Sequence, residues 1–537
     1  MNNKGQSVIQ IFDTTLRDGS QTAGINFSAE DKKRIADRLA RLGVAWIEGG
    51  WPGSSPKDNQ FFELMRDRQW GESKLVAFGS TARSGNPVES DKGLKKIIDS
   101  GADAACIFGK SWDIHATKAL GITLEENLKL IHNSIAFLKK HFDTVFFDAE
   151  HFFDGYNSDK HYAVKALKAA SSAGADALVL CDTNGGNIPY RIAEVTTAVL
   201  KRFPDNEIGI HAHNDCELAV ANSLAAARVG ATHVQGTING LGERCGNANL
   251  ISIIPTLQLK MGLDCGPVGK QLHALKSISD FVNEMANRLP WRHQPYVGQN
   301  AFAHKGGIHV SAIRKDRRMY EHIDPSLVGN EQRILVSDQA GKSNILSKLQ
   351  QLEPEAGLDA DDPIVAEAVQ RIKELEATGY AFEGADASFQ LLLRRAMGRF
   401  ERHFELIRFR VYDEKRGHHE APESEATVQI RVGQQLLHTA ALGNGPVNAM
   451  DEALREALSD VYPSLEPMRL SDFKVRVLST REATEAAVRV LIESTDGKSK
   501  WSTVGVSTDV LEAAYRALND AIEFKLMIDG VPAPSDD

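Results

Sequence analysis

The chain of 537 residues is 42% hydrophobic and 25% charged, with a formal net charge of −10 at pH 7. This composition is typical of globular proteins, and the length allows roughly two to four domains. The net negative charge argues against a nucleic-acid partner. Five cysteines without a CxxC pair argue against a disulfide scaffold, and no apolar run has the length of a signal peptide or membrane span. We therefore expect a cytoplasmic protein with no membrane partner.

Eight short apolar stretches predict β-strands in the first half of the chain. They begin at residues 8, 44, 74, 104, 144, 177, 207 and 232. Each is rich in Val, Ile or Phe and apolar on both faces, as expected of parallel strands that are buried on both sides. Enough chain separates them for one crossover helix each time. This alternation favours a (β/α)8 TIM barrel, in the α/β class, over a doubly wound open sheet.

Capping signals support the predicted helices between these strands. Ser28 precedes an amphipathic stretch, Asp31 stands three residues further on, and Gly43 follows its last apolar residue. This spacing predicts a helix with a capping box at its start and a glycine at its end. Thr123 and Glu126 repeat the pattern before a second amphipathic stretch.

Three regions follow from the pattern along the whole chain. We expect the barrel to occupy residues 1–285, with a last helix over 265–285. Residues 286–402 form a linker region, irregular and basic at first and helical from about residue 339. Residues 403–530 form an α+β domain of duplicated ββα units, because two stretches read strand, turn, strand, loop and amphipathic helix. Such a domain could pair with a second copy, bind a small ligand between its repeats, or serve in packing alone.

Polar residues gather where the predicted barrel strands end. Catalytic groups of TIM barrels lie at the carboxyl ends of the strands, so these residues are the candidates for chemistry. They are Asp13, Arg17 and Asp18; Glu48; Asp148 and Glu150; Asp182, Thr183 and Asn184; His211, His213, Asn214 and Asp215; and Asn239, Glu243, Arg244 and Asn247.

The motif HAHND is the sharpest local signal for a metal. His211 and His213 stand two positions apart on a strand, so their side chains point to the same face. Two imidazoles with a carboxylate form a common ligand set for divalent metals, although an isolated HxH pair is more often an ordinary half-buried pair. Asn247 could add an amide oxygen, or it could be a turn residue or helix cap. Further along, His304 and His309 beside paired glycines are candidates for acid–base chemistry.

Four motifs, FDTTLRDGSQ, HAHND, GERCGNANL and AFAHKGGIH, resemble the family of isopropylmalate, homocitrate and citramalate synthases. This family contains metal-dependent Claisen-condensing enzymes on a (β/α)8 barrel, and the C-terminal repeats are similar to its regulatory dimerisation domain. Residues 47–58 and 146–156 look most like the citramalate synthase branch. The chain has Trp51-Pro52 where leucine-pathway enzymes tend to have Phe-Pro, and Ala149-Glu150-His151 where they tend to have Ser-Glu-Asp.

The resemblance implies an acyltransferase that condenses acetyl-CoA with a 2-oxo acid. The citramalate synthase branch implies pyruvate as the acceptor, with (R)-citramalate and CoA as products that feed isoleucine biosynthesis. The alternatives are 2-isopropylmalate synthase in leucine biosynthesis, with 2-oxoisovalerate, and homocitrate synthase, with 2-oxoglutarate. A lyase or carboxyltransferase on the same barrel, and a degenerate barrel that only senses amino acids, are more distant alternatives.

The resemblance also implies roles for particular residues and partners. The implied ligands of a divalent ion (Mg, Mn or Zn) are Asp18, His211, His213 and Asn247; the implied catalytic residues are Arg17, Glu150, His309 and Tyr320; Arg17 and Thr183 would bind the 2-oxo acid. Asp13 is interpreted as a partner that holds Arg17 or a ligand in place. A homodimer is expected, in which the segment carrying His309 is donated across subunits. Isoleucine or leucine is a possible effector of the C-terminal domain.

Overall fold

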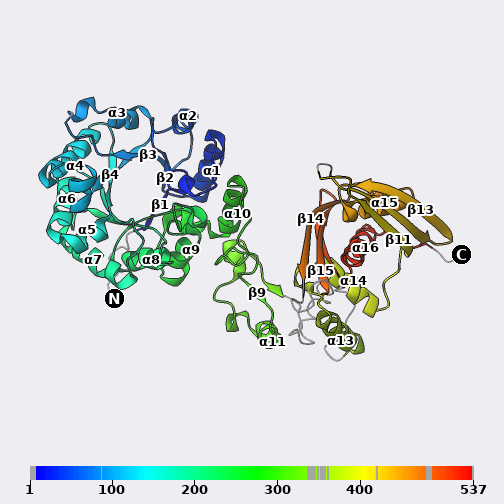
Figure 1. The fold of residues 1–537 in the computed structure, drawn as a ribbon. Coiled ribbons are helices and arrows are strands. Elements are labelled where there is room, and N and C mark those ends of the chain that lie inside the picture. Colours follow the sequence, from blue (N-terminus) through cyan, green and yellow to red (C-terminus); the bar gives the residue numbers. More distant parts are fainter. Residues whose placement is uncertain are drawn as a thin grey trace. The chain divides into compact units, whose positions relative to one another are not determined.

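The computed structural model describes residues 8–85, 87–334, 362–418, 421–478 and 486–534, with the isolated positions 346, 350 and 359 (Figure 1). The chain divides into two compact units. The first comprises Met1–Phe302 with Ile323–Glu331, and the second comprises Ala303–His322 with Gln332–Asp537. The expected three-part division at residues 285 and 402 stays a prediction.

The first unit contains a closed barrel of eight parallel strands, which confirms the predicted fold. The strands are β1 (Gln10–Asp13), β2 (Trp46–Gly50), β3 (Lys74–Ser80), β4 (Ala104–Lys110), β5 (Thr144–Glu150), β6 (Ala177–Asp182), β7 (Glu207–Ala212) and β8 (His233–Gly236). They follow one another around the barrel in chain order, and β1 pairs with both β2 and β8 to close it. All eight predicted strands are present.

Helices form the outer layer of the barrel in Figure 1. They are α1 (Ala29–Leu42), α2 (Pro56–Leu64), α3 (Lys92–Asp99), α4 (Leu124–Leu138), α5 (Phe152–Ser158), α6 (Lys160–Ser172), α7 (Pro189–Arg202), α8 (Ala219–Val229), α9 (Leu250–Pro255) and α10 (Leu275–Met285). Ser28 and Asp31 form the predicted capping box of α1, and Gly43 ends it in the left-handed conformation at φ 86°. Thr123 caps α4 through the amide of Glu126.

Side chains fill the inside of the barrel as well as the layer between strands and helices. A buried cluster within the barrel contains Phe12, Val76, Phe78, Ala104, Cys106, Phe146 and Ala177. Its aromatic rings touch one another, with Phe12 and Phe146 at 5.6 Å between centroids. Because the interior is packed, a ligand has to bind at the end of the barrel rather than along its axis.

The prediction of one helix over residues 265–285 is wrong in its first half. This stretch forms two short 3-10 turns before α10 begins at Leu275. Gly266 is left-handed at φ 66°, and Pro267 follows it. The left-handed Gly266 ends the preceding segment, and Pro267 stands in the first turn of the first 3-10 helix rather than of an α-helix.

The second unit begins with two short strands and three α-helices among the described residues. It contains the paired two-residue strands β9 (Ala303–His304) and β10 (Arg333–Ile334), and the helices α11 (Gly307–Lys315), α13 (Pro363–Ala377) and α14 (Asp386–Ala396). The last two helices confirm the helical pattern predicted after residue 360. A further helix expected over residues 343–352 lies outside the described residues, except for positions 346 and 350.

A duplicated module forms the rest of the second unit. The first copy comprises β11 (Glu405–Glu414), β12 (Glu423–Val432), β13 (Gln435–Gly443) and α15 (Pro446–Ser459), and the second comprises β14 (Arg469–Val477), β15 (Val488–Thr495), β16 (Lys500–Ser507) and α16 (Val510–Ile528). Each copy is an antiparallel three-stranded sheet whose helix packs on its second and third strands. The predicted ββα duplication is therefore confirmed, with one more strand in front of each copy. No helix among the described residues has the length and apolar character to cross a membrane.

Candidate active site

Three donors from opposite ends of the barrel sequence meet at the carboxyl end of its strands. Asp18 lies in the turn after β1, His211 in β7 and His213 directly after it. The Oδ2 atom of Asp18 lies 3.3 Å from Nε2 of His211 and 3.9 Å from Nε2 of His213, and the two Nε2 atoms lie 3.4 Å apart. All three residues are buried. Within the described residues they are the one group of three His, Cys, Asp or Glu side chains close enough to share a metal ion.

Outer contacts fix the ring of His211. Its Nδ1 atom lies 2.8 Å from Oε1 of Gln235, whose amide nitrogen donates to Oδ1 of Asp148 at 3.0 Å. The acceptor Oε1 requires the hydrogen on Nδ1, so Nε2 is the ring atom that His211 presents to the cluster. A metal-binding histidine is typically oriented in this way. Gln235 was not among the sequence candidates, although it stands on β8 at the same level as the polar rim residues.

Asn247 completes a donor set that fits a divalent ion. An isolated β-bridge pairs it with His213, and its Nδ2 atom donates to the carbonyl of Leu241 at 3.2 Å. Its Oδ1 atom is buried and has no hydrogen-bond partner. A buried oxygen without a partner is costly unless something binds to it. Gly242 lets the loop approach this side chain, because a Cβ there would lie 2.1 Å from Nδ2 of Asn247.

The charges around the cluster favour the ligating forms of two side chains. Burial alone would raise the pKa of Asp18, but the Arg17 guanidinium and His211 hold that pKa well below its usual range. Burial and the neighbouring His211 lower the pKa of His213 to about 4. A carboxylate and a neutral imidazole are the states in which these residues bind a metal.

Arg17 is held beside the cluster by Glu48 rather than by Asp13. Its Nε atom donates to Oε2 of Glu48 at 2.7 Å, and its Nη1 atom lies 3.5 Å from Oδ2 of Asp18. The guanidinium carbon lies 3.8 Å from the ring centroid of Phe78. Asp13 instead accepts hydrogen bonds from the amide and hydroxyl of Thr15. Asp13 was predicted to hold Arg17 or a ligand in place; the Arg17 part of this prediction is wrong, because the carboxylate bonds to Thr15 in the turn after β1.

Glu150 and Thr183 lie on neighbouring strand ends. The carboxylate of Glu150 forms an ion pair with Lys110 at the end of β4. Sequence reasoning missed Lys110, although its position as the last residue of a barrel strand was a signal. The hydroxyl oxygen of Thr183 accepts the amide of His151 at 2.9 Å. The hydroxyl hydrogen of Thr183 is therefore free to point elsewhere.

An aromatic wall stands next to Arg17. It consists of Trp51 after β2, Phe78 on β3 and Phe108 on β4. Phe78 and Phe108 stack at 5.5 Å between centroids, and the ring of Trp51 stands nearly perpendicular to both at 5.8 Å. Because the guanidinium of Arg17 lies over the ring of Phe78, the aromatic wall is directly next to the charged cluster at the barrel rim.

His309 and Tyr320 belong to the second unit and contact each other. Their ring centroids lie 4.3 Å apart, and both side chains are exposed. Nearby, Nε2 of His304 lies 3.4 Å from Oε1 of Glu321. The structure thus groups Asp18, His211, His213, Asn247 and Arg17 at the barrel rim, and it groups His309 with Tyr320 on α11 and the turn after it. The roles of all these residues stay predictions.

Three family models together match most of the chain. The model described as HMGL-like matches residues 8–282, the homocitrate synthase post-HMGL domain-like model matches residues 296–379, and the LeuA allosteric (dimerisation) domain matches residues 383–526. The first match covers the barrel, and the last covers α14 together with the duplicated module.

Curated relatives match over nearly the full length. The (R)-citramalate synthases of Geobacter sulfurreducens and Aquifex aeolicus are each 52% identical over 97% of this chain and 98% of the relative. The 2-isopropylmalate synthase of Sulfolobus acidocaldarius is 36% identical over 71% of this chain and 94% of its own length. The chain therefore belongs to the HMGL-like family, in the group that contains these (R)-citramalate synthases.

Proposed function

We propose that the protein condenses acetyl-CoA with pyruvate to give (R)-citramalate and free CoA, as a step of isoleucine biosynthesis. The observation that carries this proposal is the buried group of Asp18, His211 and His213 with the fixed cation Arg17 beside it. A Lewis acid at the ketone and a cation for the developing negative charge both favour a Claisen condensation on a 2-oxo acid.

Asp18, His211 and His213 would hold a divalent ion, with Asn247 bound directly or through water. The ion, when bound, supplies a Lewis acid that polarises the ketone and orients the 2-oxo acid. The buried Oδ1 atom of Asn247 and the fixed tautomer of His211 support this assignment. A set of two nitrogens and two oxygens suits Mg, Mn or Zn.

Arg17 and Thr183 orient and stabilise the acceptor in this proposal. Glu48 and Phe78 hold the Arg17 guanidinium in place before substrate binds, so it needs no reorganisation when an oxyanion forms. Thr183 accepts the amide of His151, which leaves its hydroxyl hydrogen to donate to the carboxylate of the 2-oxo acid.

Glu150, His309 and Tyr320 are the candidates for proton transfer. A base has to take a proton from the methyl group of acetyl-CoA, and hydrolysis of the thioester needs an oriented water. Glu150 is oriented by its ion pair with Lys110 and lies on the barrel rim. His309 and Tyr320 come from the second unit, so we propose a homodimer in which this segment serves the partner's barrel. The match to a dimerisation domain supports this assembly.

The aromatic wall favours pyruvate over the larger acceptors. Trp51, Phe78 and Phe108 occupy the rim beside Arg17, where the side chain of a 2-oxo acid would extend. A methyl group needs little space there, whereas the branched chain of 2-oxoisovalerate or the second carboxylate of 2-oxoglutarate needs the rings to move. Synthesis of 2-isopropylmalate or homocitrate is therefore the weaker alternative.

The test is release of CoA from acetyl-CoA, followed with a thiol reagent, for a panel of 2-oxo acids with and without a chelator. Pyruvate is expected to give the highest kcat/KM, and the chelator is expected to stop the reaction until metal is restored. Absence of CoA release with every acid would overturn the proposal, and a preference for 2-oxoisovalerate would replace the acceptor.

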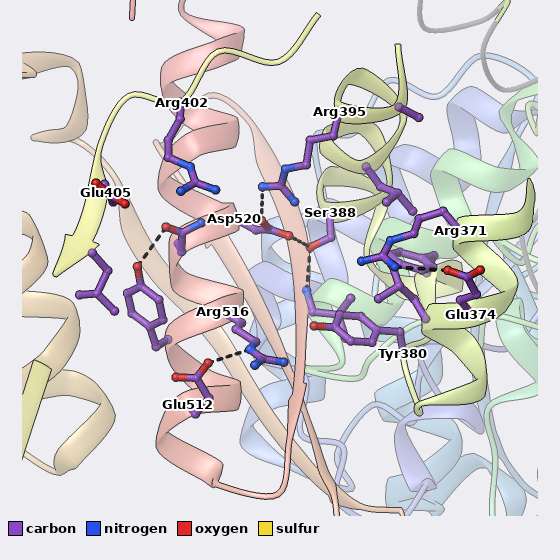
Figure 2. A pocket seen from close by; sticks show the side chains of 18 of the residues that line it. Arg371, Glu374, Tyr380, Ser388, Arg395, Arg402, Glu405, Glu512, Arg516 and Asp520 are labelled. Atoms are coloured by element: carbon purple, nitrogen blue, oxygen red, sulfur yellow. Dashed lines mark hydrogen bonds and ion pairs between the residues drawn. The ribbon is translucent and has the colours of Figure 1, made fainter. Parts of the chain in front are cut away.

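The second unit has a cavity suited to an amino-acid effector, and we propose isoleucine or leucine. The cavity measures about 870 Å³ and lies among α13, α14 and α16 (Figure 2). Three ion pairs line it: Arg371 with Glu374 along α13, Arg516 with Glu512 along α16, and Arg395 with Asp520 between α14 and α16. Apolar side chains, among them Leu375, Phe382, Leu392 and Val504, line it as well. Charges of both signs beside an apolar surface suit a zwitterion with an aliphatic chain.

Adding isoleucine or leucine to the assay tests this second proposal. One of them is expected to lower the activity and to raise the melting temperature, because a ligand that binds the folded state stabilises it. The variant Arg402→Ala is expected to weaken the effect, since Arg402 lines the cavity. If neither amino acid changes activity or melting temperature, the effector role is wrong.

A further inference from the structure

A buried ion pair lies beneath the loop that follows β2. The side chain of Lys32, on α1, is 4% exposed and pairs with Oδ1 of Asp58 in the first turn of α2. Its Nζ atom also donates to the carbonyl of Gly49 at 3.3 Å. Burial of an ion pair often contributes little net stability, because desolvation offsets the attraction. We therefore ask which segment the Lys32–Asp58 pair holds in position.

Asp58 fixes the position at which the chain leaves β2. Its Oδ2 atom accepts the amide of Trp51 at 3.2 Å and the hydroxyl of Ser54 at 3.0 Å. Its own amide donates to Oγ of Ser55 at 3.1 Å, which caps α2. Gly50, at φ 151°, lets the carboxylate come this close, because a Cβ there would lie 2.8 Å from it. Oδ2 of Asp58 thus holds the loop that carries Trp51, while Oδ1 pairs with Lys32.

Trp51 connects this loop to the aromatic wall. Its ring makes edge contacts with Phe78 and Phe108, at interplanar angles of 85° and 82°. Phe78 in turn lies under the guanidinium of Arg17. A continuous series of contacts therefore runs from the buried Lys32–Asp58 pair to the cation beside the metal-binding group.

We propose that Lys32 and Asp58 are positioning residues that set acceptor specificity. They hold the ring of Trp51 perpendicular to Phe78 and Phe108, so that the aromatic wall excludes 2-oxo acids larger than pyruvate. This inference rests on the proposed condensation. A displaced Trp51 would open space beside the acceptor's side chain without touching the metal-binding group.

The test compares Asp58→Ala with the wild type in the full-length protein. The variant loses the acceptor for Trp51 and Ser54, so the KM for pyruvate is expected to rise about tenfold while the KM for acetyl-CoA stays the same. The ratio of kcat/KM for pyruvate to that for 2-oxobutanoate is expected to fall by at least about fivefold. Asp58→Asn keeps the side-chain volume and one acceptor oxygen, so its KM and acceptor ratio should lie between those of the wild type and Asp58→Ala. If Asp58→Ala does not fold, Asp58→Asn takes its place in the test.

Asp37→Ala, on the same helix as Lys32, is the matched control for Asp58→Ala. Oδ1 of Asp37 accepts the indole N–H of Trp70 at 2.9 Å, so its removal also breaks a carboxylate–tryptophan contact between α1 and a loop. Trp70 is not part of the aromatic wall. The control is expected to lower the melting temperature without changing the ratio between the two acceptors.

A second readout separates this inference from the proposed reaction. Acrylamide quenching of Trp51 is obtained as the fluorescence difference between each variant and the same variant carrying Trp51→Phe. Asp58→Ala is expected to make Trp51 more accessible, whereas Asp37→Ala is not. If the wild type turns over no 2-oxo acid, the proposed reaction and its acceptor specificity are wrong. The quenching measurement would still test whether Asp58 holds Trp51 in position. If Asp58→Ala matches Asp37→Ala in both selectivity and quenching, the inference is wrong.

Discussion

The barrel rim and the second unit each bury a charged cluster, but the two clusters differ in how fully their polar atoms are satisfied. At the rim, Oδ1 of Asn247, Nδ1 of His213 and Oε1 of Glu48 are buried without hydrogen-bond partners. In the second unit, His403 donates from Nδ1 to Oε2 of Glu523 at 2.7 Å and from Nε2 to the carbonyl of Val531 at 2.9 Å. The backbone amide of His403 also donates to Glu523.

This difference separates a site from a structural contact. Buried polar atoms without partners are expensive, and a protein retains them where a ligand can satisfy them. A fully paired cluster has nothing left to bind, so its contribution lies in holding segments together. By this reasoning, changes at the rim should affect binding and turnover, whereas changes at His403 or Glu523 should affect stability.

The largest expected effect is that of Asp18→Ala. Removing the carboxylate takes away the one charged ligand and leaves two histidines and Asn247, so turnover is expected to fall by more than about 10³-fold and bound metal to be lost. Circular dichroism and the melting temperature should stay close to the wild type, because Asp18 forms no part of the packed core. Metal content measured by elemental analysis checks the ligand role directly. A fully active, metal-free variant would contradict it, and His211→Ala should behave in the same way.

Glu523→Ala should give the converse result. The substitution leaves the buried imidazole of His403 without its carboxylate partner, which costs about 3 kcal/mol in the free energy of unfolding. Urea unfolding followed by a probe in the second unit measures this loss. The metal content of the barrel should be unchanged. Loss of metal in this variant without a loss of stability would contradict the structural role assigned to the His403–Glu523 contact.

Glu48→Gln should lower turnover by a smaller factor than Asp18→Ala. The amide retains an acceptor for Arg17 but loses the charge that fixes it, so kcat is expected to fall about 30-fold with little change in metal content. Comparison of kcat with metal content separates the role of Arg17 from that of the ligands. Asp13→Asn serves as the control, because Asp13 bonds to Thr15 rather than to Arg17. An equal loss in both variants would contradict the assignment of Glu48.

Much of the first unit could be predicted because its signals are local. The eight strands followed from short apolar runs, and Ser28 with Asp31 marked the start of α1. The spacing of His211 and His213 sufficed to place both rings on one face. Together with the barrel fold, which brings β1 next to β8, this spacing also brought Asp18 near them.

Contacts between distant residues could not be read in the same way. Glu48 reaches Arg17 across 31 positions, and nothing in the sequence shows that the nearer Asp13 is occupied by Thr15. The first strands of the two repeats were missed for a different reason. Residues 405–414 do alternate apolar and charged side chains, as at Phe409 and Val411, but the strand is mostly exposed and rich in charge, so its signal is weaker than that of β12.

The smallest effect concerns pH and tests whether the His403 cluster holds the second unit together. Burial works to lower the pKa of His403, but its hydrogen bonds to Glu523 and Val531 and the charges of Glu523 and Glu401 raise that pKa above 6.5. Both ring nitrogens donate to acceptors, so the contact requires the protonated imidazole, and the hydroxyl of Tyr462 donates to the backbone carbonyl of His403.

A pKa that is higher in the folded state contributes stability that is complete below the unfolded value, about 6.5, and is lost as pH rises through the folded value. The free energy of unfolding of the second unit should therefore fall between pH 6 and pH 9 by about 1 kcal/mol more in the wild type than in His403→Gln. Urea unfolding at the two pH values measures the difference. A gap between the two proteins that stays constant or widens with pH would show that His403 is neutral in the folded state, and the cluster would then resemble the rim in leaving a buried atom unsatisfied.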